Sequence, residues 1–190
     1  MGRISSERIV CGVFGALCAL GAGDSASAKV ATVGAVAEIA HTQPPVNEAE
    51  RLLLAHNSER ARLGLPALIW NPALARDAAG HAKSLAEEGR LRHASATARN
   101  GRGENLWMGT AGAWNSAAMV AMFIDERRHF RAAAFPDVSV TGNWYDVGHY
   151  SQIVWRDTRE VGCAVETGQG NDVLVCRYYP AGNVMGQAPY

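Results

Sequence analysis

The sequence has no surplus of charge of either sign. Its 190 residues include 18 Lys and Arg against 18 Asp and Glu, so the formal net charge is zero. Because non-specific binding to a phosphate backbone depends on clustered positive charge, this balance argues against a nucleic-acid partner. Beyond the N-terminus, the chain also lacks an apolar run of the roughly 20 residues needed to span a bilayer. We therefore expect no membrane span in the mature protein.

The first 28 residues have the layout of a secretory signal peptide. Arg3 and Arg8 precede the apolar run IVCGVFGALCALGAG, and the small residues Ala26-Ser27-Ala28 follow it. A retained membrane anchor is the alternative interpretation of this run. We predict a signal peptide over 1–28, a linker without an apolar period over 29–46, and one domain over 47–190 that is secreted, periplasmic or extracellular.

Cysteine is scarce, and the four cysteines divide into two pairs. Cys11 and Cys18 lie in the predicted signal peptide, which leaves Cys163 and Cys176 for the domain. An even number of cysteines in an exported domain favours a disulfide. The turn signal GQGN (168–171) lies between two alternating segments rich in β-forming residues, and a hairpin symmetric about it places the two cysteines opposite each other. A metal-binding cysteine pair is the alternative, but it would need closer spacing and more ligands.

Helices are predicted early in the domain and strands mostly late. Asn47 begins a capping box for a helix that ends near Gly64, and Asn71 caps a second helix that ends at Gly89. A short strand is expected over 101–109 and a third helix over 116–131, while GHYSQIVW (148–155) fits either a short helix or a strand. This order predicts an α+β domain in which helices pack against an antiparallel sheet.

Four polar side chains stand among residues typical of a core. Glu126 falls on the apolar face of the helix predicted over 116–131, and Glu104 directly precedes Leu-Trp in GENLW. His149 lies inside GHYSQIVW, and His93 lies in a predicted loop. Because buried polar groups need partners, these residues can converge on one cleft, although each of them alone also fits a structural role.

Two kinds of site fit this set of side chains. Imidazole and carboxylate are the usual non-sulfur ligands of Zn²⁺, and three protein ligands with one open position make a catalytic zinc site. The same groups also form hydrogen-bonded networks without a metal, in which each carboxylate orients an imidazole. No HExxH motif or other close spacing is present, so the spacing does not decide between the two.

The ordered motifs of the domain resemble those of one family. The segments GRGENLW, the helix that carries Glu126, GHYSQIVW, VGCAV and CRYYPAGNVMGQAPY follow one another in the order of the hallmark motifs of the CAP superfamily, which groups cysteine-rich secretory proteins, antigen 5 and plant pathogenesis-related 1 proteins. The earlier segments AHNSERARLGLPAL and WNPALARDAAGHA are similar to that family's opening. The resemblance covers about 46–190.

The resemblance implies a three-layer α-β-α sandwich, with a small antiparallel sheet between helices and a central cleft. Matching residue by residue, the cleft would be lined by a tetrad of His93, Glu104, Glu126 and His149. The two histidines would hold a divalent metal such as Zn²⁺, and Ser151 and Gln152 would form hydrogen bonds behind them.

The chain also departs from the family pattern. Phe123 stands where the family often has tryptophan, a change of size that should alter packing rather than chemistry. One disulfide in place of the three of plant members indicates a simplified, bacterial-type member. The C-terminal PAGNVMGQAPY resembles the end of plant members, and we expect it to wrap around the domain.

Three functions are compatible with this resemblance, since a fold does not determine an activity. The first is a secreted, non-enzymatic binding module with a metal in its cleft and a lipid, sterol or protein partner, in a defence or host-interaction role. The second is a metal-assisted hydrolase or protease with Glu104 or Glu126 as general base, or with Ser151 as a nucleophile that lacks the usual nucleophile elbow. The third is a structural protein of the cell envelope, in which the tetrad stabilises the fold.

Overall fold

The structure of the protein is a computed structural model that describes residues 47–190, so the predicted signal peptide (1–28) and linker (29–46) lie outside the described residues. The elements follow in the order α1 (Glu48–Arg62), β1 (Ile69–Trp70), α2 (Pro72–Glu88), α3 (Ala96–Arg99), β2 (Gly103–Thr110), α4 (Ser116–Asp125), the 3-10 helices η1 (Glu126–His129) and η2 (Trp144–Val147), α5 (Gly148–Ile153), β3 (Glu160–Gly168) and β4 (Asn171–Tyr179). Within 47–190, no helix has both the length and the apolar composition needed to cross a membrane.

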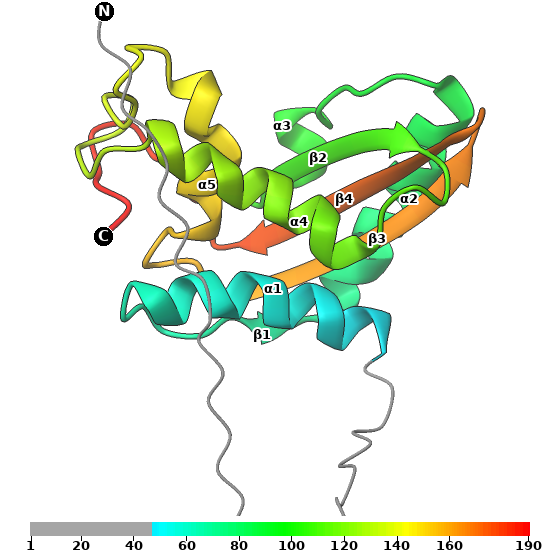
Figure 1. Ribbon diagram of the computed structural model, residues 1–190, viewed down its shortest axis with the longest axis horizontal. Helices are drawn as coiled ribbons and strands as arrows, with labels where there is room; N and C mark the ends of the chain where they lie inside the picture. The colour runs from blue at the N-terminus through cyan, green and yellow to red at the C-terminus, as the bar shows by residue number, and fades with distance from the viewer. Residues whose placement is uncertain (1–46) are drawn as a thin grey trace, which may run out of the picture. The chain divides into compact units, whose positions relative to one another are not determined.

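The strands form one sheet in the order β1-β3-β4-β2, with helices on both faces. In Figure 1, α1, α4 and α5 lie on one side of the sheet and α2 lies on the other. This arrangement confirms the predicted α+β fold and its three layers. The sheet is mixed rather than wholly antiparallel, because the two-residue β1 between α1 and α2 runs along the start of β3 in the same direction.

Alternating side chains of β4 supply both layers of the core. Leu174, Cys176 and Tyr178 pack with the residues of α1, α4 and α5. Val173 and Val175 face the other way and pack beneath the buried alanines of α2. This division follows from the period of two along a strand, which sends successive side chains to opposite faces of the sheet.

The β3–β4 hairpin has the register that the sequence predicts. Cys163 lies opposite Cys176, and the two are joined by a disulfide. Val161 pairs with Tyr178 on the same face. The loop closed by the disulfide is short, and in the chain-entropy model it stabilises the fold by about 3 kcal/mol.

The helix predicted over 116–131 is shorter than expected. The α-helix ends at Asp125, and η1 continues the chain as a tighter turn to His129. Phe130 then leaves the helical path and forms an isolated β-bridge with Ser139, so the predicted helix cannot extend further. The loop expected over 91–102 contains the short helix α3, and GHYSQIVW forms the helix α5 followed by a turn.

The C-terminal segment wraps around the domain, as expected from PAGNVMGQAPY. The amide of Ala181 donates to the carbonyl of Gly101, and the amide of Arg156 donates to the carbonyl of Pro189. Phe135 exchanges backbone hydrogen bonds with Gly186 and Gln187. The segment is therefore attached at several points to loops that are distant in sequence.

Arg60 on α1 is buried and has no carboxylate partner within the described domain. Its guanidinium donates hydrogen bonds to four backbone carbonyls, those of Pro66, Ile153, Trp155 and Thr158. Burial, with a further contribution from neighbouring arginines, lowers its pKa to about 10. Because three of these carbonyls belong to the C-terminal end of α5 and the turns after it, Arg60 fixes α5 against α1.

Arg60→Lys should lower the free energy of unfolding by about 3 kcal/mol, because a lysine cannot reach all four carbonyls and leaves buried acceptors unsatisfied. Urea unfolding followed by circular dichroism measures this loss. The matched control is Arg76→Lys on the exposed side of α2, where the change should stay within about 0.5 kcal/mol. Equal stability of Arg60→Lys and the wild type would contradict this account.

His56 on α1 is also fully buried, and its hydrogen bonds require a neutral ring. Nδ1 donates to the carbonyl of Leu52, and Nε2 accepts from the Tyr178 hydroxyl, each at 2.8 Å. Asn105 in turn donates to the Tyr178 oxygen and to the carbonyl of His149. Desolvation, only partly opposed by the Leu52 hydrogen bond, lowers the pKa of His56 to about 4.

We expect His56 to make stability depend on pH. The unfolded chain takes up a proton near pH 6.5 and the folded protein only near pH 4, so this contribution is complete above pH 6.5 and is lost as the pH falls toward 4. The wild type should lose about 1.5 kcal/mol more than His56→Gln between pH 6.5 and 5. Urea unfolding at several pH values measures the difference, and parallel curves for the two proteins would refute the assignment.

Candidate functional site

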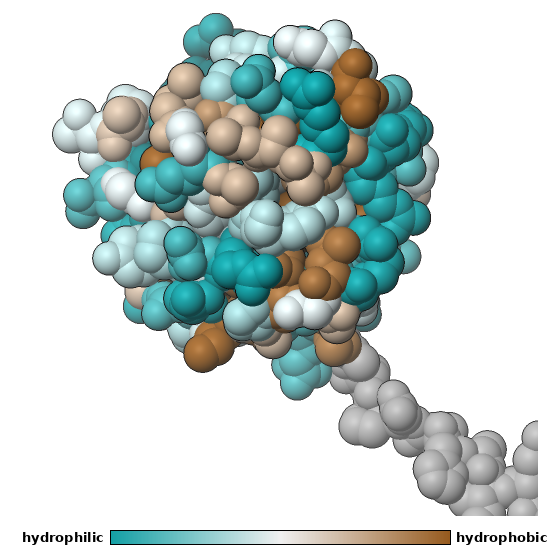
Figure 2. Space-filling view, turned by 90° about the vertical axis from the view of Figure 1, so that its left-hand side faces the viewer, coloured by the Kyte–Doolittle hydropathy of each residue, from teal (hydrophilic) through white to brown (hydrophobic). Residues whose placement is uncertain are grey.

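A cleft of about 490 Å³ opens where the start of β2, α5 and the C-terminal segment meet. His93, Glu104 and His149 lie around it, so three of the four residues of the expected tetrad share one cavity. Phe135, Trp144 and Tyr145 form an aromatic wall of the same cleft. Figure 2 shows the face on the α5 side of the molecule, where hydrophobic residues stand apart among hydrophilic ones rather than forming one continuous patch.

His93 and Glu104 form the first imidazole–carboxylate pair. Glu104 is the second residue of β2, and its side chain is fully buried. Its Oε1 lies 2.6 Å from Nδ1 of His93 and also accepts a hydrogen bond from the amide of Ala94. The carboxylate therefore holds both the ring of His93 and the backbone that follows it.

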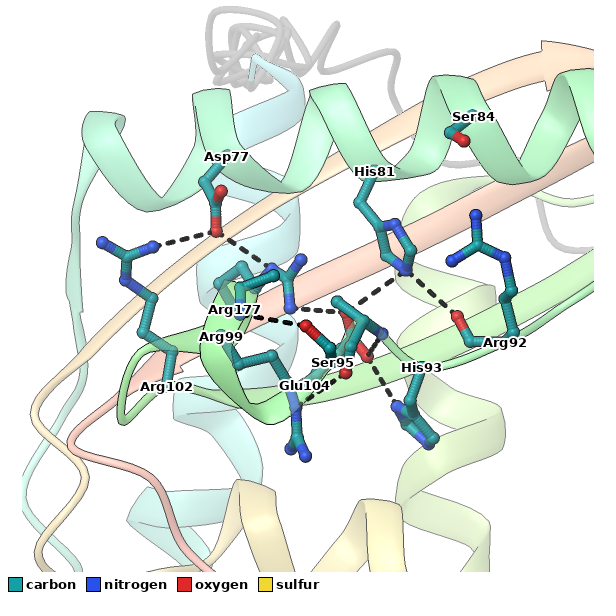
Figure 3. A network of polar contacts seen from close by, with 12 residues as sticks. Asp77, His81, Ser84, Arg92, His93, Ser95, Arg99, Arg102, Glu104 and Arg177 are labelled. Carbon is teal, nitrogen blue, oxygen red and sulfur yellow. Dashed lines mark hydrogen bonds and ion pairs between the residues drawn. The ribbon is translucent and has the colours of Figure 1, made fainter.

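The other oxygen of Glu104 is contacted by two residues that the sequence analysis did not identify, Arg177 and His81. Nη1 of Arg177 lies 2.5 Å from Oε2, and Nε2 of His81 lies 3.5 Å from it. Figure 3 shows Glu104 between His93 on one side and these two residues on the side of α2. Burial alone would raise the pKa of the Glu104 carboxyl, but the hydrogen bond from His93 and the charge of Arg177 together hold it below its usual value.

His149 and Glu126 form the second pair. Glu126 lies at the junction of α4 and η1, and its Oε1 is 2.6 Å from Nδ1 of His149. Its Oε2 accepts hydrogen bonds from the amides of His149 and Tyr150, each at 3.0 Å. The ring of Phe123 stacks on His149 at 4.6 Å between centroids. Glu126 thus supports His149 from behind rather than lining the cleft.

The two pairs have the same chemical form. In each, Nδ1 of the imidazole donates to the carboxylate, so that Nε2 is the ligand atom of the neutral ring. Within 47–190, His and Glu of the cleft do not bring three ligand atoms within 4.8 Å of one another. His56, Cys163 and Cys176 do so, but the disulfide removes the thiolates that a metal would need.

Ser151 and Gln152 have structural partners. The Ser151 hydroxyl lies within hydrogen-bond distance of the Gly148 carbonyl and of Oδ1 of Asn183, and it has no hydrogen bond to any imidazole of residues 47–190. Gln152 donates to Thr158 and accepts from the amide of Gly182. Both side chains therefore fasten the C-terminal segment to α5, next to the cleft.

One signal in the sequence could have identified Arg177. In the predicted hairpin, Cys176 and Tyr178 face one side, so the arginine between them must face the other side with Val173 and Val175. A charged residue on an apolar strand face needs a buried partner. The hairpin alone does not name that partner, because Glu104 reaches it only through the pairing of β2 with β4.

Comparison with known sequences identifies the relatives of this chain. The model of the CAP family, described as the cysteine-rich secretory protein family, matches residues 53–178. Pathogenesis-related protein 1B of Nicotiana tabacum is 35% identical over 153 residues, which cover 80% of this chain and 86% of that protein. Pathogenesis-related protein PRMS of Zea mays is 32% identical over 161 residues, which cover 83% and 92% of the two chains.

Solved structures agree with this similarity. The crystal structure of NaASP2 with Zn²⁺ superposes with a TM-score of 0.63 at 25% identity and covers 75% of this chain and 84% of that one. Hookworm platelet inhibitor shares the fold, with a TM-score of 0.60 at 19% identity over 78% and 79% of the two chains. With the matched sequence model, the relatives and the shared sandwich all in agreement, the chain belongs to the CAP family of cysteine-rich secretory proteins.

Proposed function

We propose that the protein is an exported, non-enzymatic binding module that holds a divalent metal ion such as Zn²⁺ through Nε2 of His93 and of His149. One observation carries this proposal. Two imidazoles face the same cleft, and each has its Nδ1 atom engaged by its own carboxylate.

The donor set fits such a metal. Imidazole nitrogen is a preferred ligand of Zn²⁺, and ligating histidines almost always donate their other ring N–H to a carboxylate or a carbonyl. Glu104 and Glu126 already provide that support. Two protein ligands leave coordination positions for water or for a polar group of a ligand, and the bound ion would supply a positive charge at that place. The related protein NaASP2 has a crystal structure with Zn²⁺, which supports the choice of this ion as a probe.

The state of the carboxylates favours binding over hydrolysis. A general base must be free to take a proton, whereas Glu104 is buried between His93 and Arg177, and its pKa is lowered. Both oxygens of Glu126 accept hydrogen bonds. No imidazole of the described domain forms a hydrogen bond with Ser151, which argues against the nucleophilic version.

The aromatic wall supports a lipid or sterol as the ligand. Phe135 and Trp144 make an edge-to-face contact, Trp144 and Tyr145 stack at 3.9 Å, and the Tyr145 side chain is 70% exposed. An apolar body can lie on this wall while its polar group reaches the histidines. The Cys163–Cys176 disulfide and the description of the family as secretory support export, with 1–28 as the signal peptide.

The metal proposal predicts stoichiometric binding of Zn²⁺ by the wild type, measured by calorimetry and elemental analysis. His93→Ala with His149→Ala should abolish binding, because both ligand atoms are removed. Glu104→Gln and Glu126→Gln should each weaken it roughly 10- to 100-fold, since the orienting acceptors are lost.

The matched control for this experiment is His129→Ala, a half-buried histidine of η1 outside the cleft, which should bind as the wild type does. Absence of binding by the wild type would refute the metal site. A lower melting temperature of the double variant would then support the structural role of the tetrad. Turnover of a substrate that disappears with a chelator and in Glu104→Gln would favour the hydrolase instead.

The ligand proposal predicts saturable binding of a fluorescent sterol. Tyr145→Ala should weaken it about 10-fold, because one aromatic face on the ligand is worth about 1.5 kcal/mol. Tyr179→Ala, an exposed tyrosine at the end of β4 and outside the cleft, is the control and should leave the affinity unchanged. Equal effects of the two substitutions would place the sterol elsewhere.

A further inference from the structure

A second hollow, of about 400 Å³, lies beside α2, and two of its lining residues contact the carboxylate of Glu104. Asp77, His81 and Ser84 of α2 line it together with Arg177 of β4. Figure 3 shows His81 and Arg177 next to Glu104 on the side of α2, Asp77 next to Arg177, and Ser84 farther along the helix, while His93 points away from that helix. Glu104 therefore lines the cleft, while its Oε2 atom is contacted by two residues that line the second hollow, His81 and Arg177.

Arg177 contacts the carboxylate of the first imidazole–carboxylate pair, His93 and Glu104, on the side of α2. It lies directly across the β2–β4 ladder from Glu104, so the two side chains project from the same face of the sheet. Its side chain is 3% exposed, and its Nη1 atom makes an ion pair with Oε2 of Glu104. Because the carboxylate is also buried, its position depends on where this guanidinium is held.

Asp77 holds the guanidinium from the side of the second hollow. Its Oδ2 lies 3.1 Å from Nε of Arg177 and also accepts a hydrogen bond from Nη1 of Arg102. His81 contacts the carboxylate of Glu104 itself. Its Nε2 atom lies 3.5 Å from Oε2 of Glu104 and 3.0 Å from the carbonyl oxygen of Arg92. A continuous set of contacts thus runs from the partly exposed Asp77 through Arg177 and Glu104 to His93.

The second pair, Glu126 and His149, is not supported by a comparable set of side chains in the described domain. Within the described domain, no arginine or lysine lies within ion-pair distance of Glu126, whose partners are the His149 ring and two backbone amides. Backbone amides of α5 cannot rearrange without moving the helix, whereas Arg177 and His81 are side chains beside a cavity. The orientation of His93 therefore depends on side chains that contact its carboxylate, whereas that of His149 depends on the backbone of α5.

We propose that Arg177 and His81, from the second hollow, are positioning residues for His93. They orient Glu104 and so set the ring tautomer and the metal affinity of His93, without affecting His149. This inference deepens the proposed metal-binding function and, for the affinity, rests on it. A change at the hollow beside α2 would then alter the metal affinity of His93 without any contact with the metal.

The first test uses the metal-free protein labelled with ¹⁵N and records long-range ring spectra of both histidines. In the wild type, His93 should carry its proton on Nδ1. In Arg177→Lys, which keeps the charge but cannot bridge Glu104 and Asp77, the share of His93 with the proton on Nε2 should rise. His81→Gln, a milder change that keeps the fold if Arg177→Lys does not, should shift it in the same direction.

His149 is the internal control, and Ser84→Ala is the matched one. Ser84 lines the same hollow but donates to Glu88 rather than to Glu104, so this variant should leave both rings unchanged. An unchanged His93 in both Arg177→Lys and His81→Gln would overturn the inference. So would an equal change of His149, because it would indicate a general loosening of the fold.

The second test is calorimetry with Zn²⁺ on the same variants. Arg177→Lys and His81→Gln should each bind roughly 10-fold more weakly than the wild type, and Ser84→Ala should bind equally well. If the wild type binds no Zn²⁺, the proposed function fails, whereas the tautomer experiment still decides whether Arg177 and His81 position His93. Unchanged affinity in both variants would overturn their effect on the metal.

Discussion

The alternation of side chains along β4 is the constraint on which both halves of the site depend. Tyr178 faces the layer of α1 and α4, where its hydroxyl links His56 to Asn105 and so to the backbone of His149. Arg177, one residue earlier, faces α2 and holds Glu104. A shift of one residue in register would exchange these faces, so that Arg177 would no longer contact Glu104 and the Tyr178 hydroxyl would no longer reach His56 and Asn105. The disulfide fixes the register of β4 against β3 next to Arg177, whereas the pairing of Arg177 with Glu104 depends on the ladder between β4 and β2.

Two buried ions in the domain are stabilised in opposite ways. Arg60 pairs with no carboxylate of residues 47–190, and its guanidinium donates instead to four backbone carbonyls. Glu104 is paired with the guanidinium of Arg177 and is also contacted by two imidazole rings and one backbone amide. Removing one partner of a buried ion is costly because the remaining charge stays away from water. The consequence is a rigid α5 at one end of the cleft and a closely held carboxylate at the other, with the two histidines between fixed supports.

Local signals in the sequence predicted the parts of the fold that depend on local chemistry. The capping box at Asn47 and the left-handed Gly89 after α2 appear where expected, and GQGN predicted the hairpin register down to the cysteine pair. The end of α4 could not be predicted, because it depends on a bridge from Phe130 to Ser139. Spacing likewise could not join His93 to Glu104 or His149 to Glu126; their assignment came from the family resemblance. The role of His93 and His149 as metal ligands stays a prediction.

The C-terminal wrap has a consequence for the order in which the protein matures. Gly182 and Asn183 form part of the cleft, and the chain beyond them is fastened to loops around Phe135 and Arg156. During synthesis these residues leave the ribosome after every helix and strand of the domain. A nascent chain therefore has its histidines before it has a complete cavity, because the cleft is complete only when the segment after β4 has emerged. Any molecule that needs the complete cleft can therefore bind only after the whole domain has been made, not during its elongation.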